Sequence, residues 1–211
     1  MVRDQLVKVL AWRLGNRKDM EERIIAEMDL AQELTLEQHT WRPWFLAKDL
    51  EGVSLTAGDS SFALPADFLD EVEDAVLWLV EPETGGYIEC HKEGVEDLRR
   101  FIPTTARPYA YAVDKGFVKL SQAVPAALNV SWQYMAKDVL MSAANVETLW
   151  LKHAPDLVLA VLGAEIAGKH LQNPNLAGAF QADMGQAWQR LQALDTAKRE
   201  INQQRAMGRV N

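Results

Sequence analysis

The positions of histidine, cysteine and carboxylate residues give a first test for metal binding. The four histidines, His39, His91, His153 and His170, are nowhere three or four residues apart, which is the spacing that places two imidazoles on one helix face. Glu89-Cys90-His91 brings three ligand types together. Neighbouring side chains of a strand point to opposite faces, however. We therefore predict that this trio flanks a turn and holds no metal.

The same residues give little support for catalysis. Cys90 would need an adjacent base and an orienting group to act as a nucleophile, and the sequence indicates neither. An acidic run follows Leu64-Pro65, and paired carboxylates can perform acid–base chemistry, but a solvated surface with Phe68, Leu69 and Val72 packed inward is favoured. The run comprises Asp67, Asp70, Glu71, Glu73 and Asp74. The glycines, including Gly85-Gly86 and Gly163, form no phosphate-binding loop. We predict a non-enzymatic chain without a cofactor.

The C-terminal segment is basic although the chain as a whole is acidic. Its cations are Arg190, Lys198, Arg199, Arg205 and Arg209. Two interpretations stand with equal weight: favourable charge at the C-terminal end of a helix, or a surface that docks on a partner. The residues that would dock are Lys198, Arg199, Ile201, Arg205, Met207 and Arg209.

The segment that precedes this basic end predicts two packed helices. Residues 157–164 carry no charge, so this helix should be buried on every side. Asn173-Pro174 should end it, and Asn175 is predicted to cap a second, long helix with one apolar stripe. The expected core of the bundle is Leu157, Leu159, Val161, Leu162, Leu176, Phe180, Met184, Trp188 and Leu191.

The rest of the chain divides into helical and β-rich parts. Apolar residues at helical spacing predict helices over residues 2–14 and 18–39. Short apolar runs separated by turns follow, including a hairpin over 110–120 and an alternating strand over 128–134. The predicted fold class is therefore α+β, mainly an α-helical bundle of N- and C-terminal helices with a β-rich, antiparallel insertion. We expect bundle helices over 1–46 and 139–196, the insertion over 47–138, and an extended tail over 197–211.

Composition narrows the class of protein. The chain has 211 residues, 48% of them hydrophobic, and 22 basic against 30 acidic residues give a net charge of −8. This indicates an ordinary soluble protein and argues against coating of nucleic acid by phosphate neutralisation. A single cysteine fits a reducing compartment, and no apolar run indicates a signal peptide or a membrane span. Seven tryptophans are suggestive of interfaces.

Several of these segments together resemble the head-to-tail adaptor (connector) proteins of tailed bacteriophages and are similar to the tail tubular protein A group. The residues that carry the resemblance are Arg13-Leu14-Gly15-Asn16-Arg17 with the helix to Gln32, Leu64-Pro65-Ala66-Asp67-Phe68, Arg107-Pro108-Tyr109-Ala110-Tyr111, Val139-Leu140-Met141-Ser142 with Asn145, Trp150-Leu151, Pro155 to Leu159, Gly163-Ala164, and Trp188 with Leu191. The chain departs from the pattern at Ala106, where glycine is commoner, and over residues 122–126, which are less proline-rich.

The resemblance implies a structural virion protein at the neck, assembled in the host cytoplasm. It implies a homo-oligomeric ring, commonly of twelve copies, which binds the portal protein through its C-terminal segment and meets tail or nozzle proteins. DNA would pass through the ring without specific binding, and no membrane would be involved. Another neck or tail-completion ring is an alternative function. A small cytoplasmic ligand-binding domain, with a pocket of Trp41, Trp44, Trp132 and Trp150, is the alternative from a different class.

Overall fold

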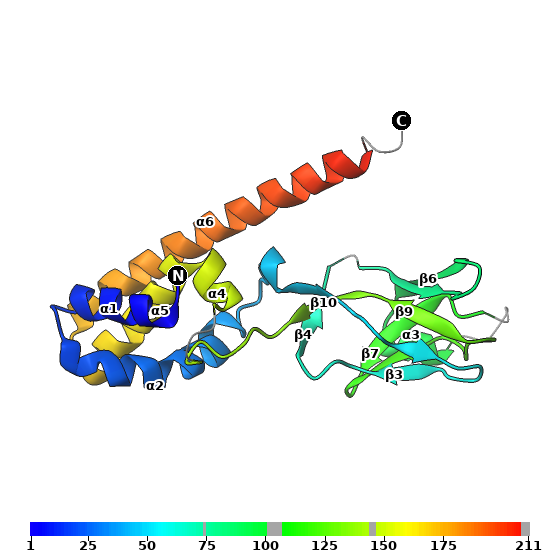
Figure 1. The fold of residues 1–211 in the computed structure, drawn as a ribbon, viewed down its shortest axis with the longest axis horizontal. Coiled ribbons are helices and arrows are strands. Elements are labelled where there is room, and N and C mark those ends of the chain that lie inside the picture. Colours follow the sequence, from blue (N-terminus) through cyan, green and yellow to red (C-terminus); the bar gives the residue numbers. More distant parts are fainter. Residues whose placement is uncertain (74, 101–106, 144–146, 208–211) are drawn as a thin grey trace. The chain divides into compact units, whose positions relative to one another are not determined.

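The computed structural model describes residues 1–73, 75–100, 107–143 and 147–207, with side chains at all of these positions except 99–100 and 199–207. The chain folds into two compact units (Figure 1). Unit 1 contains Met1–Leu46 and Asp138–Asn211, and unit 2 contains Ala47–Lys137. The chain therefore leaves the first unit, builds the second and returns.

Unit 1 is helical. Its N-terminal elements are α1 (Arg3–Arg13), the 3₁₀ turn η1 (Lys18–Met20), α2 (Glu21–Ala31), the π-helical turn η2 (Gln32–Leu36) and the 3₁₀ turn η3 (Trp44–Leu46). Its C-terminal elements are α4 (Leu149–His153), α5 (Pro155–Glu165), the π-helical turn η4 (Ile166–His170) and α6 (Pro174–Met207). The helices predicted over 2–14 and 18–39 correspond to α1 and to the continuous run η1-α2-η2.

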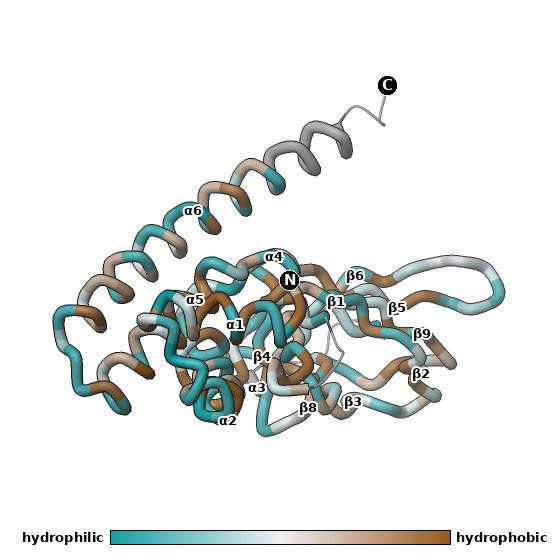
Figure 2. The backbone as a smooth tube through the Cα atoms, turned by 60° about the vertical axis from the view of Figure 1, so that its left-hand side comes forward, coloured by the Kyte–Doolittle hydropathy of each residue, from teal (hydrophilic) through white to brown (hydrophobic). Residues whose placement is uncertain are grey.

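Helix α5 lies at the centre of unit 1. Every residue from Leu157 to Gly163 is buried, as its charge-free sequence predicts. Helix α6 packs along one side of α5, and helices α1 and α2 also contact α5 (Figure 2). At Gly163, an added Cβ would overlap the ring of Phe180 on α6. The absence of a side chain at this position allows the two helices to pack closely.

The start of α6 corrects one sequence-based prediction. The capping residue is Asn173, whose Oδ1 accepts a hydrogen bond from the backbone N–H of Leu176 at 3.1 Å, and Pro174 occupies the first helical position. The prediction that Asn175 caps this helix was wrong, because proline is favourable in the first turn, where its missing N–H costs nothing. Asn173-Pro174 therefore begins α6, after the preceding helix has already ended at His170.

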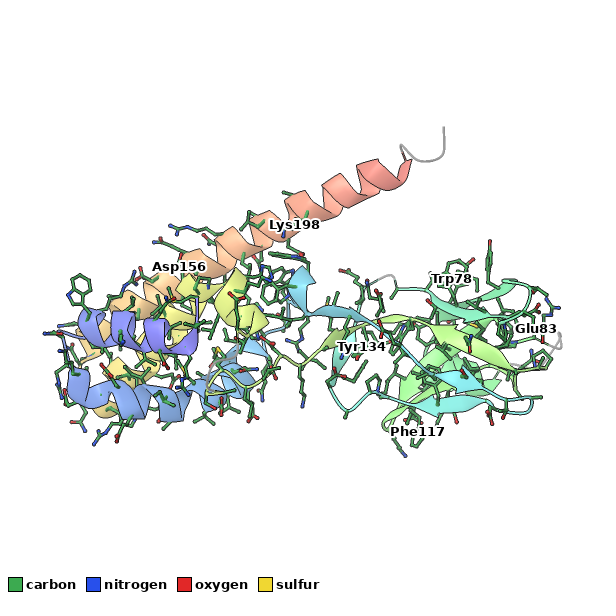
Figure 3. The ribbon with its side chains drawn as sticks, in the orientation of Figure 1. Trp78, Glu83, Phe117, Tyr134, Asp156 and Lys198 are labelled. Carbon is green, nitrogen blue, oxygen red and sulfur yellow. The ribbon has the colours of Figure 1, made fainter. Side chains whose placement is uncertain are left out.

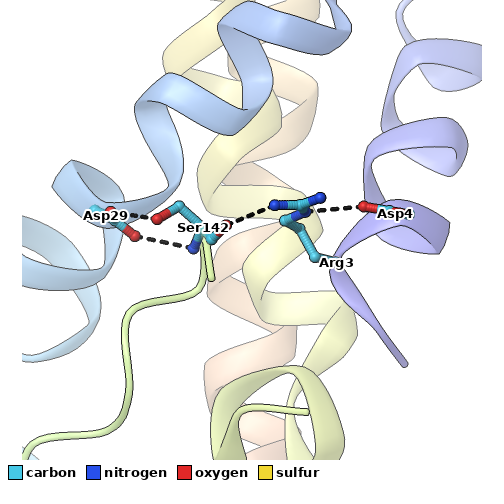
Figure 4. Close-up of polar contacts among 4 residues, drawn as sticks. All are labelled: Arg3, Asp4, Asp29 and Ser142. Carbon is cyan, nitrogen blue, oxygen red and sulfur yellow. Dashed lines mark hydrogen bonds and ion pairs between the residues drawn. The ribbon is translucent and has the colours of Figure 1, made fainter. Parts of the chain in front are cut away.

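The returning chain is attached to α1 and α2 by polar contacts (Figure 4). Asp29 on α2 accepts hydrogen bonds from the backbone N–H and the hydroxyl of Ser142, at 3.0 and 2.6 Å. Arg3 on α1 donates to the Ser142 carbonyl at 2.7 Å. One turn further on, the buried Gln32 donates to Glu37 and accepts from the backbone N–H of Met141. Side chains far away in sequence thus supply the hydrogen-bond partners of a segment that has no regular structure.

The described residues of unit 2 form two sheets and one helix. The three-stranded sheet has the order β1-β10-β4, and the seven-stranded sheet has the order β2-β9-β5-β6-β7-β8-β3. The strands are β1 (Ala47–Asp49), β2 (Ser54–Leu55), β3 (Ser61–Ala63), β4 (Phe68–Glu71), β5 (Leu77–Val80), β6 (Tyr87–Lys92), β7 (Ala110–Asp114), β8 (Phe117–Leu120), β9 (Leu128–Ser131) and β10 (Gln133–Ala136), and the helix is α3 (Val95–Arg100).

Two strand predictions are confirmed. Strands β7 and β8 form the expected hairpin, in which Asp114 pairs with Phe117 across the turn. Over residues 128–134 the side chains alternate as predicted, with Leu128, Val130, Trp132 and Tyr134 buried. This strand is interrupted at Trp132, however, because β9 belongs to the larger sheet and β10 to the smaller one.

The predicted fold class, a mainly helical bundle with a β-rich antiparallel insertion, was wrong. The fold is a mixed α+β structure in which helices make up about 45% of the chain and the seven-stranded sheet is curved and barrel-like. Unit 2 has its own core, formed by residues from Leu55 to Ala136 with Trp132 and Tyr111 among the largest. The sheet is also not purely antiparallel, because β6 and β7 are parallel. A parallel pair needs a crossover connection, and α3 lies in it.

Figure 2 shows the hydropathy of each residue along the backbone. Among the residues that the structure describes, no helix is both long and apolar enough to cross a membrane.

The close approach of α5 and α6 can be tested at Gly163. Alanine normally stabilises a helix interior relative to glycine by about 1 kcal/mol, but Gly163→Ala should instead lower the free energy of unfolding by about 1–3 kcal/mol, because the new methyl group overlaps Phe180. Gly185→Ala is the matched control, since nothing lies within 4 Å of its Cβ position, and it should stabilise the protein. Urea unfolding measures both changes. Equal stabilisation by the two variants would contradict the packing described.

Candidate functional site

A cluster of aromatic rings joins α6 to the rest of unit 1. We call it the aromatic cluster, and it consists of His39, Trp41, Trp44, Phe45, Trp150, His153 and Trp188. Trp188 on α6 stacks on His39, with ring centroids 3.9 Å apart, and receives the edges of Trp41 and Trp150. Phe45 stacks on His153 and meets Trp150 edge-on. Edge-to-face and offset pairs of this kind contribute about 0.5–1.5 kcal/mol each beyond burial, so the cluster restrains α6 at this level.

Two charged residues of α6, about two and three turns beyond Trp188, add further contacts. Asp195 is buried, and its Oδ1 accepts a hydrogen bond from the backbone N–H of Trp44 at 3.1 Å. The Lys198 ammonium lies 3.7 Å from the centroid of the Trp44 ring, which is cation–π geometry. Trp44, at the start of η3, therefore holds α6 at two points. Its backbone N–H contacts Asp195, and its ring contacts Lys198.

Beyond Lys198 the backbone of α6 remains helical as far as Met207. These last turns extend past α4 and η3 within unit 1 (Figure 1). The 34 residues of α6 correspond to about 51 Å at 1.5 Å per residue. Of the residues predicted to dock on a partner, Lys198 lies over Trp44. The side chains of Arg199, Ile201, Arg205 and Met207, and the whole of Arg209, lie outside the described residues.

The residues predicted to form the bundle core lie on α5 and α6. Leu157, Leu159, Val161 and Leu162 of α5 are buried, as are Phe180, Trp188 and Leu191 of α6, whereas Leu176 and Met184 are partly exposed. The stripe on α6 faces α5 at Phe180 and the aromatic cluster at Trp188. Leu194, one turn beyond Leu191, is 54% exposed.

A small groove runs between the start of α5 and the middle of α6. It has a volume of about 150 Å³ and includes Leu157, Leu191, Leu194 and Ala187, with Asp156 and Arg190 at its polar edges. Figure 3 labels Asp156 and Lys198 at this end of unit 1. The groove combines apolar walls with one acidic and one basic side chain, and it lies directly beside the aromatic cluster through His153.

The residues examined for metal binding and catalysis are separated by the fold. Glu89, Cys90 and His91 lie on β6, where Cys90 is buried and its neighbours are exposed. Burial raises the pKa of the Cys90 thiol to about 12, so the thiol is protonated at neutral pH. Among the described residues, no three His, Cys, Asp or Glu side chains are grouped to hold a metal ion. Asp74 of the acidic run lies outside that set.

The rest of the acidic run has structural partners. Phe68–Glu71 form β4, which pairs with β10. Asp67 accepts hydrogen bonds from Lys48 at 2.6 Å and from the Tyr134 hydroxyl at 2.8 Å, and Glu71 pairs with Lys92. These contacts connect strands within unit 2.

The four tryptophans proposed to line a shared ligand pocket lie in different cores. Trp132 is buried in the core of unit 2, whereas Trp41, Trp44 and Trp150 belong to the aromatic cluster of unit 1. The prediction of one pocket lined by all four was therefore wrong. In unit 2, Trp78 and Tyr87 form an outward aromatic pair with ring centroids 5.0 Å apart, and Phe117 lies on the opposite side of that unit (Figure 3).

Sequence reasoning missed His39, His153 and Asp195 as parts of this site. Asp195 is a polar residue within the apolar face of α6. A carboxylate at such a position indicates a buried contact only when its hydrogen-bond partner is known. The run Trp41-Arg42-Pro43-Trp44-Phe45-Leu46 could have indicated an aromatic contact, because it breaks the helical pattern while keeping large apolar rings.

The attachment of α6 to η3 can be tested at Asp195. Asp195→Ala should destabilise the protein by about 1–3 kcal/mol, because it leaves the partly buried N–H of Trp44 without this acceptor. It should also increase hydrogen exchange in the last turns of α6, measured by mass spectrometry. Asp183→Ala, at an exposed position of the same helix, is the control and should change neither quantity. Unchanged exchange after Asp195→Ala would remove Asp195 from the attachment.

His153 makes the aromatic cluster sensitive to pH. Burial lowers the pKa of His153, and the nearby Lys152 and Lys198 lower it further. The folded state thus favours the neutral imidazole, so this contribution to stability is complete above the unfolded pKa of about 6.5 and is lost as the pH falls through the lower folded pKa. His153→Phe keeps the stacking partner of Phe45 and should flatten the stability profile in this window. Thermal unfolding between pH 7 and 5 measures the two profiles, and equal slopes would exclude His153 as the cause.

The comparisons with known proteins agree with a structural role. A search of curated proteins found no match. One family matches residues 4–210, which is almost the whole chain and includes both units and the aromatic cluster. The match supports a bacteriophage adaptor and structural protein of the virion, a class that is generally non-enzymatic. The chain belongs to the SU10 adaptor protein family.

Proposed function

We propose that this adaptor forms a ring at the neck of the virion that joins the portal protein to the tail. The family membership supports contact with other head or tail proteins of the phage. The observation that carries the proposal further is the end of α6, which is attached at Asp195 and Lys198 and continues as a helix to Met207. We propose that this end, residues 199–211, docks on the portal.

The contacts that hold α6 support this docking role. A helical segment shorter than about 12–15 residues is marginal in water without tertiary contacts. Asp195 and Lys198 supply such contacts immediately before the last turns of α6, residues 199–207, which span about 14 Å. An anchored helix loses less conformational freedom on binding than a free segment does. Its sequence carries Arg199, Arg205 and Arg209, so a partner groove with acidic edges fits it best.

The finer features follow the resemblance of the sequence. We propose a dodecameric ring with an axial channel for DNA, of the type formed by the tail tubular protein A group, assembled in the host cytoplasm. The net charge of −8 supports passage of DNA without specific binding, because a negatively charged protein repels phosphates overall. Tail or nozzle proteins would meet the opposite side of the ring.

Truncation tests the docking role. A chain that ends at Lys198 keeps the contacts of Asp195 and Lys198 with Trp44, so it should unfold at the same temperature as the full chain. It should lose co-purification with the portal protein by at least about tenfold, which corresponds to roughly 1.4 kcal/mol. Calorimetry measures the unfolding temperature, and binding to surface-immobilised portal protein measures the loss of affinity.

Two further variants separate charge from length. Replacing Arg199, Arg205 and Arg209 by glutamine should weaken portal binding, and replacing Asn202 and Gln203 by alanine is the neutral control. Portal binding by the truncated chain at full strength would refute docking through this segment. Binding to tail proteins without any binding to portal would instead favour the alternative, a neck or tail-completion ring.

A further inference from the structure

Trp12 is the most exposed large hydrophobic residue among those that the structure describes, with 72% of its surface accessible. It lies on α1, whose other apolar side chains Leu6, Val7, Leu10 and Ala11 are buried against the bundle. Asp4 and Lys8 are also exposed and precede Trp12 at steps of four, so the three share one helix face. Tryptophan at such a position is typical of the centre of an interface.

The groove between α5 and α6 has the size and the lining to accept such a ring. Its volume is about 150 Å³. An apolar protein cavity of about 150 Å³ binds benzene, which matches the six-membered ring of an indole. Its apolar walls include Leu157, Leu191 and Leu194, the last of which is 54% exposed. An occupant with an aromatic ring would therefore cover the exposed apolar surface of both partners.

The charges around the two features are complementary. The groove has one acidic edge, Asp156, and one basic edge, Arg190. The face of α1 carries one basic and one acidic residue beside Trp12, namely Lys8 and Asp4. Asp4 is already paired with Arg3 at 2.8 Å, whereas Lys8 lies one turn from Trp12. Insertion of the ring brings Lys8 toward Asp156, so that charges of opposite sign approach each other.

The two features are formed by different elements of the same unit, Trp12 by α1 and the groove by α5 and α6. Helix α6 packs on one side of α5, and α1 packs on α5 and α2 (Figure 2). When one surface of a molecule binds a different surface of the next copy, the contact is head-to-tail. Repeating this contact generates a ring if the rotation between neighbouring copies closes. We propose that Trp12 of one copy inserts into the α5–α6 groove of the next copy, so that this contact joins neighbouring subunits of the ring.

This inference rests on the proposed ring, and substitution of Trp12 tests the contact directly. Because its side chain is exposed, Trp12→Ala should leave the unfolding temperature of the isolated chain unchanged. It should weaken ring formation on the portal by at least about tenfold, counted as stacked rings by electron microscopy. Tyr87→Ala, which removes another highly exposed aromatic side chain but in unit 2, is the control and should leave ring formation unchanged.

Cross-linking identifies the partner surface. A chain with Lys8→Cys is mixed with a chain with Asp156→Cys, rings are assembled on the portal, and a short bismaleimide is added. Cys90 is fully buried and should not react. The mixture should give cross-linked dimers of the two chains, and either chain alone should give at least about tenfold fewer.

The outcomes distinguish this contact from the ring itself. Rings that form without the mixed cross-link, rings that are unaffected by Trp12→Ala, or a cross-link from Lys8→Cys to the portal would each overturn the contact and leave the proposed ring standing. Failure of the unmodified chain to form any ring in the presence of portal would overturn both.

Discussion

The packing of α6 on α5 is the interaction on which unit 1 depends. Helix α5 has apolar residues on all sides and cannot face water anywhere, so its stability requires a cover along its whole length. Helix α6 supplies that cover, and Gly163 lets Phe180 approach the α5 backbone. Because α1 and α2 also pack against α5, removal of this contact would expose the centre of the unit.

The same packing gives the C-terminal helix a defined base. Trp188 lies on α6 about two turns beyond Phe180. It brings His39, Trp41 and Trp150 together around a single ring. Asp195 and Lys198 then hold α6 to Trp44. A helix anchored over several turns loses less conformational freedom on binding than a flexible tail does, which fits the docking role that we propose for its end.

Unit 2 shows why a short strand is harder to predict than a long buried helix. The alternation of residues 128–134 was sufficient to predict a strand with one buried face, and Asp114-Lys115-Gly116 was sufficient to predict a hairpin. Strands β1 and β4 were not predicted, because Lys48, Asp49 and Asp70 make them polar and only their pairing with β10 makes them strands. The parallel pairing of β6 with β7 likewise leaves no local signal, since it joins segments on either side of α3.

The sequence by itself determined the identity and burial of α5, the existence of a long amphipathic α6 and the absence of a recognisable catalytic motif, because helical periodicity and motif spacing are local properties. Only the tertiary structure decided that unit 2 has its own core, that Asn173 caps α6, and that His39, Trp44, His153 and Asp195 meet at the base of that helix. Each of these depends on partners distant in sequence, and the free energy of burying a ring or a carboxylate is set by the groups that surround it.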